Sequence, residues 1–113
     1  MLFRSNRSDI TWHGVDPKVP DFSAKSTTLA FALDGRETGG EPDRDFYVAC
    51  NASADPALFR IPASPTGKPW HRVVDTALPS PQDIVEEGAD PLIASGSVYP
   101  VEAHSLIVLM TAP

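Results

Sequence analysis

The sequence predicts an all-β fold, an antiparallel β-sandwich of about seven short strands with Greek-key connections. Seven segments rich in β-branched, aromatic and aliphatic residues are spread along the chain, turn signals separate them, and no segment has the periodicity of an amphipathic helix. Twelve prolines, against a usual share of ~5%, also disfavour long helices. At 113 residues the chain is one domain, too short for a barrel enzyme of roughly 250 residues.

Three of these segments lie in the first half of the chain. Residues 10–13 are short and aromatic. Residues 26–33 alternate between large apolar side chains and Thr or Ala, which is the period-two pattern of a half-buried strand. After a loop rich in glycine and proline, residues 45–51 have no polar face, which favours a central strand packed on both sides.

The second half supplies the remaining segments. Residues 57–62 alternate again, and residues 70–76 begin as an apolar strand and end at a loop broken by prolines. Residues 81–87 are compatible with one helical turn. The chain closes with strands at 96–102 and 105–111, and the second of these is almost wholly apolar, which predicts a central position.

Composition excludes several classes of partner. The net charge of -6 argues against a nucleic-acid surface, because such affinity comes largely from Lys and Arg that neutralise phosphates. No stretch reaches the ~18 apolar residues of a membrane span, so no membrane partner is expected. One cysteine excludes an intrachain disulfide and agrees with a reducing compartment. Since the N-terminus also lacks the features of a secretory signal, we expect a cytoplasmic location.

Residues able to bind metals are scattered. His13, His71 and His104 are not at ligand spacing from one another or from Cys50. Cys50 lies inside an apolar run, where it is typical of a small core residue. We therefore expect no metal and no cofactor.

Asp75 is the carboxylate best placed for chemistry, because it stands where an apolar strand meets a loop. A glycoside hydrolase, however, needs a second carboxylate and a cleft, and neither is evident in the sequence. An aspartate at the end of a strand commonly accepts backbone N–H bonds from the following turn. We interpret Asp75 as a strand-ending residue. Aromatic rings such as Trp12, Trp70 and Tyr99 are candidates either for stacking on a sugar or for the core.

The order and spacing of these landmarks resemble the C-terminal region of bacterial isoamylases, the glycogen-debranching enzymes of the alpha-amylase superfamily. The matching stretches are DITWHG (9–14), PDF (20–22), TLAFALDG (28–35), DFYVACNAS (45–53), LFRIP (58–62), WHRVVDTALPSPQD (70–83) and VEAHSLIVLM (101–110). The chain departs from the pattern at Phe22, where relatives often carry tryptophan, and at His104, where an arginine often precedes the serine.

The resemblance implies a domain organisation. In that family the β-domain follows a catalytic (β/α)8 barrel, so residues 1–14 are expected to be the tail and linker from a preceding barrel and residues 15–113 the C-terminal β-sandwich. The family's nucleophilic aspartate, acid/base glutamate and third aspartate belong to barrel segments that this chain does not contain. No residue here is therefore assigned a catalytic role, although the parent protein is expected to be a glycoside hydrolase.

The function implied by the resemblance is that of a non-catalytic domain in an enzyme that cleaves α-1,6 branch linkages. Such a domain packs on the barrel of the same polypeptide and stabilises it, and we expect Trp12, His13 and Phe22 to form the apolar interface with the barrel. The alternative is a carbohydrate-binding module for glycogen or another α-glucan, with Trp70 and Tyr99 as the candidate glucan contacts. A stand-alone immunoglobulin-like interaction domain is a third class.

Overall fold

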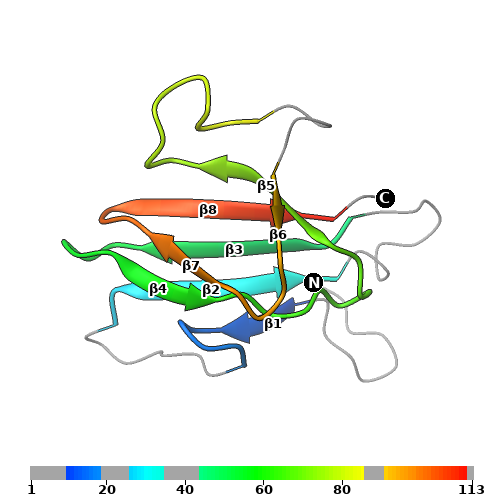
Figure 1. Ribbon diagram of the computed structural model, residues 1–113. Helices are drawn as coiled ribbons and strands as arrows, with labels where there is room; N and C mark the ends of the chain where they lie inside the picture. Colours follow the sequence, from blue (N-terminus) through cyan, green and yellow to red (C-terminus); the bar gives the residue numbers. More distant parts are fainter. Residues whose placement is uncertain (1–9, 19–25, 35–43, 86–90, 112–113) are drawn as a thin grey trace.

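The computed structural model describes residues 10–18, 26–34, 44–85 and 91–111, which form eight strands and no helix (Figure 1). The strands are β1 (Ile10–His13), β2 (Thr28–Leu33), β3 (Phe46–Asn51), β4 (Ala57–Arg60), β5 (Trp70–Asp75), β6 (Leu92–Ile93), β7 (Val98–Val101) and β8 (Ser105–Met110). Each of the seven predicted segments contains one strand. The eighth, β6, has only two residues and carries no recognisable pattern. The described part of the predicted helical turn forms hydrogen-bonded turns instead.

Two antiparallel sheets form two layers. The larger sheet has six strands in the order β1-β2-β3-β8-β5-β6, and the smaller pairs β4 with β7. Figure 1 shows β4 and β7 crossing in front of the middle of the larger sheet. The all-β, antiparallel prediction is confirmed. Ile10–His13, which the sequence analysis placed in the tail, pairs with β2 as the edge strand of the large sheet.

The core lies between the two layers. Its buried residues are Ala30, Ala32, Tyr47, Ala49, Phe59, Ile61, Trp70, Val101, Ile107 and Leu109. On β2 the small alanines face this core while the larger residues face away. Ala32 is the cross-strand partner of Tyr47, whose ring lies 6.1 Å from that of Trp70. Because two large rings fill the space here, the neighbouring strand has room for only small side chains.

Asn51, at the end of β3, joins the two layers. Its buried side-chain amide donates to the carbonyl oxygens of Asp55 at 2.8 Å and Val101 at 2.9 Å. The same amide also donates to the carbonyl oxygen of Glu102 at 3.2 Å, so it binds two consecutive carbonyls at the end of β7. Its Oδ1 accepts from the backbone N–H of Ser53 at 3.0 Å and from its hydroxyl. One side chain thus satisfies backbone groups from two separate segments.

We expect Asn51→Ala to lower the free energy of unfolding by about 2 to 4 kcal/mol, because buried carbonyls in two segments would lose their donor. Urea denaturation of the chain measures this loss. Ser53→Ala is the matched control, since it removes a hydroxyl at the exposed side of the same cluster and should cost less than about 1 kcal/mol. Equal losses for the two variants would contradict the role given to Asn51.

Candidate functional site

The face of the six-stranded sheet that points away from β4 and β7 is apolar from one edge to the other. We call it the outer face. Its residues are Ile10, Trp12, Leu29, Phe31, Leu33, Phe46, Val48, Cys50, Val74, Leu106, Val108 and Met110, with His71 on β5 and its partner Leu92 on β6. None of these residues is Asp, Glu, Lys or Arg. The solvated face of an antiparallel sheet is normally polar, so this composition is typical of a surface that meets a partner.

One row of cross-strand partners runs across the outer face from β1 to β5. Trp12 pairs with Phe31, Phe31 with Val48, and Val48 with Val108, and Val108 pairs with Val74 of β5. The rings of Trp12 and Phe31 are 5.6 Å apart and tilted by 59°. Trp12 is 41% exposed, although a tryptophan contributes most to stability when it is buried. The row therefore presents its largest side chain to solvent at the β1 edge.

The sequence contained a signal for this face. Residues 45–51 and 105–111 have no polar side, which predicted strands packed on both faces. In the part of the chain that the structure describes, the second layer covers only one of those faces. The sequence did not predict an interface role for the other residues of the outer face, because a period of two does not tell which side of a strand another protein surface covers.

Of the two predicted interface residues that the structure describes, Trp12 lies on the outer face and His13 does not. His13 follows it in the strand and points to the opposite side, where it is 4% exposed. Its Nδ1 accepts the backbone N–H of Lys18 at 2.8 Å. Burial, and secondarily the charge of Lys18, lower the pKa of His13 below its usual value. Phe22 lies outside the described residues, so the interface role given to these three remains a prediction.

The two predicted glucan contacts lie within or between the layers. Trp70 is fully buried, and its Nε1 donates to the carbonyl of Pro62 at 2.8 Å. Tyr99 is half-buried, and its hydroxyl accepts from Arg72 at 3.1 Å and donates to Asp75. Burial, followed by the hydrogen bond to Asp75, raises the pKa of Tyr99. Their predicted contact with glucan is untested, and neither ring forms an open, flat platform here.

Asp75 ends β5, as the sequence analysis interpreted it. A β-bulge between Arg72 and Val74 changes the alternation, so that Val74 joins the outer face while Asp75 turns toward the second layer. There Asp75 is 5% exposed. Its Oδ2 accepts the Tyr99 hydroxyl and its Oδ1 accepts the backbone N–H of Ala77 at 3.1 Å. The carboxylate therefore connects β5, β7 and the following turn.

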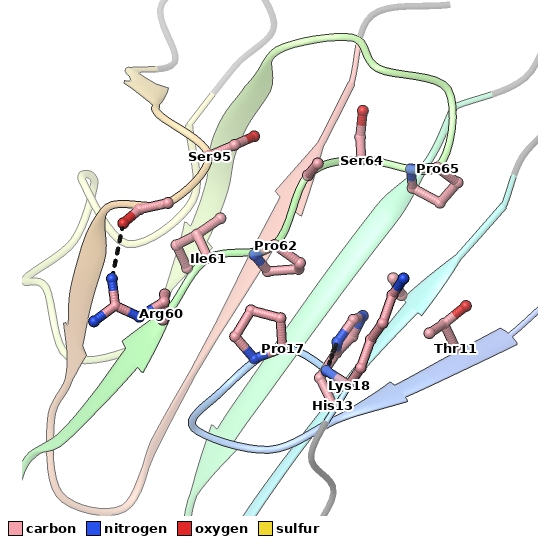
Figure 2. A pocket seen from close by; sticks show the side chains of 13 residues that line it. Thr11, His13, Pro17, Lys18, Arg60, Ile61, Pro62, Ser64, Pro65 and Ser95 are labelled. Atoms are coloured by element: carbon pink, nitrogen blue, oxygen red, sulfur yellow. Dashed lines mark hydrogen bonds between the residues drawn. The ribbon is translucent and has the colours of Figure 1, made fainter.

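An open groove lies on the inner side of β1 and β2, where the second layer ends (Figure 2). It has a volume of about 670 Å³. Figure 2 shows Thr11, His13 and Lys18 on one side of it and Ile61 and Pro62 on the other. Among the described residues that line the groove, the only aromatic ring is the imidazole of His13. The groove therefore has no flat aromatic platform for a sugar.

Within the ranges that the structure describes, no three His, Cys, Asp or Glu side chains come together as a metal would require. The described part of the chain has no helix long and apolar enough to cross a membrane.

Comparison with known proteins identifies relatives along nearly the whole chain. Residues 11–109 match the family model described as "Isoamylase 1-3, C-terminal". The chain is 37% identical over 108 residues to "Isoamylase 3, chloroplastic" of Oryza sativa subsp. japonica, and the match covers 96% of this chain but 12% of that protein. It is 30% identical over 111 residues to "Isoamylase" of Pseudomonas amyloderamosa, covering 92% of this chain and 14% of that protein. The chain thus spans about an eighth of the length of these relatives.

We expect Asp75→Asn to destabilise the chain by about 1 to 2 kcal/mol, because an amide has one acceptor oxygen and cannot serve both Tyr99 and Ala77. Urea denaturation measures the loss. Tyr99→Phe removes the same hydrogen bond from the other side, so the double variant should lose less than the sum of the two single variants. Strictly additive losses would show that the two side chains act independently.

Proposed function

Because the chain belongs to the family of isoamylase C-terminal domains, we propose that it is the non-catalytic C-terminal β-domain of an isoamylase-type glycoside hydrolase. The parent protein cleaves α-1,6-glucosidic branch bonds in glycogen or a similar α-glucan. The match over residues 11–109 supports this proposal, as does the small share of each relative's length that the chain covers. The role of the domain is to pack on the catalytic part of the polypeptide and stabilise it.

The observation that carries this role is the apolar outer face. An uncharged sheet face with an exposed tryptophan has an unfavourable contact with water, and packing on a partner surface would remove that contact. Of the predicted interface residues that the structure describes, Trp12 belongs to this face. The chemistry of the described residues also fits a supporting role, because the buried Asp75 carboxylate is engaged by Tyr99 and Ala77.

A cytoplasmic location is part of the proposal. It is supported by the single cysteine, Cys50, which cannot form a disulfide within this chain. Fractionation of the source cells followed by immunoblotting tests it, and recovery of the protein in a secreted fraction would contradict it.

We expect the protein that contains this chain to release linear chains from glycogen, and the 113-residue chain alone to release none. A reducing-end assay on glycogen, with the products separated by length, measures both. The physical reason is that the catalytic carboxylates of such an enzyme belong to its barrel. Release of linear chains by the isolated chain would overturn the non-catalytic assignment, and inactivity of the longer protein on every branched α-glucan would overturn the debranching assignment.

Glucan binding by this domain alone is the competing function. The exposed aromatic pair of Trp12 and Phe31 is the observation in its favour, but a tilt of 59° does not offer a common plane to a sugar chain. We therefore expect the chain to migrate through native gels containing glycogen as it does through gels without it. Retardation by glycogen that disappears in Trp12→Ala would instead establish a carbohydrate-binding module on the outer face.

A further inference from the structure

We propose that the groove of Figure 2, which we call the inner groove, binds a small organic acid, with the carboxylate of the acid at the β1 end and its apolar chain along the floor. The groups that receive the carboxylate are the Nε2–H of His13, the hydroxyl of Thr11 and the ammonium group of Lys18. The inference goes beyond the debranching role, because the inner groove uses none of the residues of the outer face.

The turn that follows β1 decides which nitrogen of His13 carries the proton. Its Nδ1 accepts the backbone N–H of Lys18 at 2.8 Å, so the proton of the neutral ring lies on Nε2. Burial, with a smaller contribution from the charge of Lys18, lowers the pKa of His13, so the ring is neutral near pH 7. His13 lines the inner groove, and its Nε2–H is therefore the donor that it offers to a ligand there.

The neighbouring hydroxyl belongs to the same face of β1. Thr11 and His13 are two positions apart in the strand, so their side chains point to the same side of the sheet, and both line the groove. The ring of Tyr47 lies 6.0 Å from the imidazole, which is 4% exposed, so packing holds the His13 ring in place. The two side chains thus present fixed polar groups to one end of the groove.

The charges around the inner groove favour an anion. The chain has a net charge of -6, yet the described residues that line the groove include Lys18 and Arg60 and no Asp or Glu. Arg60 lies 3.9 Å from Asp16 and donates to the carbonyl of Gly96, so its charge is already engaged. A carboxylate near Arg60 would also meet the negative charge of Asp16. The anionic end of a ligand is therefore better placed beside Lys18.

The floor of the inner groove indicates the rest of the ligand. Ala32, Ile61 and Pro62 contribute apolar surface to it, and Pro17 adds more beside Lys18. The volume of about 670 Å³ lies within the range of small-molecule sites, roughly 300–1,000 Å³. An alkyl chain laid along this floor loses contact with water, which favours binding. A short fatty acid has both this chain and the carboxylate.

The turn that carries Lys18 is already in its binding conformation. The backbone N–H of Arg60 donates to the carbonyl of Val15 at 2.8 Å, which ties the turn to β4. Lys18 has a φ of 60°, in the left-handed region that a lysine seldom adopts, and its hydrogen bond to the His13 ring holds it there. A preformed site of this kind spends little of its binding free energy on ordering the protein.

The test is isothermal titration calorimetry of the longer protein near neutral pH with sodium hexanoate, sodium acetate and hexanamide. We expect saturable binding of hexanoate that is at least about tenfold tighter than that of acetate, because four more methylene groups leave water. Hexanamide, which has no charge for Lys18, should also bind at least about tenfold more weakly than hexanoate. Equal affinity for hexanoate and acetate, tighter binding of inorganic phosphate, or the absence of saturable binding would overturn the proposal.

Lys18→Gln locates the binding in the inner groove, with Lys68→Gln as its matched control. Both substitutions remove one positive charge, but Lys68 does not line the groove, and its carbonyl still accepts the Ser64 hydroxyl after the change. Lys18→Gln should weaken hexanoate binding at least about fivefold, and Lys68→Gln should leave it unchanged. The same loss in both variants would show a general charge effect and contradict this site.

The histidines supply a second measurement, which needs no variant. In the 113-residue chain, which encloses its own core, long-range ¹H–¹⁵N spectra resolve the ring nitrogens of His13, His71 and His104. We expect His13 to carry its proton on Nε2, and hexanoate to shift that resonance and not those of the other two rings, which lie outside the groove. A proton on Nδ1 of His13, or a shift at His71 or His104 instead, would refute the assignment. Neither experiment uses glycogen, so a negative result here leaves the proposed function standing.

Discussion

The buried amide of Asn51 is the constraint on which the arrangement of the layers depends. By binding carbonyls at the end of β7 and in the turn after β3, it fixes where the small sheet crosses the large one. Tyr99 with Asp75, and Trp70 with Pro62, connect the layers at two further points. All of these ties lie on one side of the large sheet. The second layer is thereby committed to that side, and no other described strand covers the outer face.

Much of the fold could be predicted from the sequence, because strand chemistry and turn residues act locally. The apolar runs at 45–51 and 105–111 became the central strands β3 and β8, as their lack of a polar side predicted. The pair Leu92–Ile93 could not be recognised, since two residues carry no periodicity. The sequence also could not tell which face of residues 28–33 is buried, because that choice depends on the large rings of neighbouring strands.

Positions in the candidate site could be predicted from the sequence, but the directions of the side chains could not. The position of Asp75 indicated a strand end, although the bulge that turns its carboxylate toward Tyr99 leaves no mark in the sequence. Trp12 and His13 looked equivalent as interface candidates because they are adjacent and both carry rings. In a strand, adjacent residues point to opposite sides, and a backbone N–H at Lys18 engages the His13 ring on the inner side. The sequence pattern alone does not tell which of Trp12 and His13 faces outward.

The two-sided character of β3 has a consequence for how the chain tolerates change. Tyr47 and Ala49 are packed inside the domain, whereas Val48 and Cys50, which alternate with them, face outward. Adjacent positions of β3 are therefore under different structural constraints. Substitutions at positions 47 and 49 act on the packing of the core, and substitutions at positions 48 and 50 change the outer face. A strand of this kind has no neutral side on which sequence can drift freely, so variation should accumulate in the connecting loops.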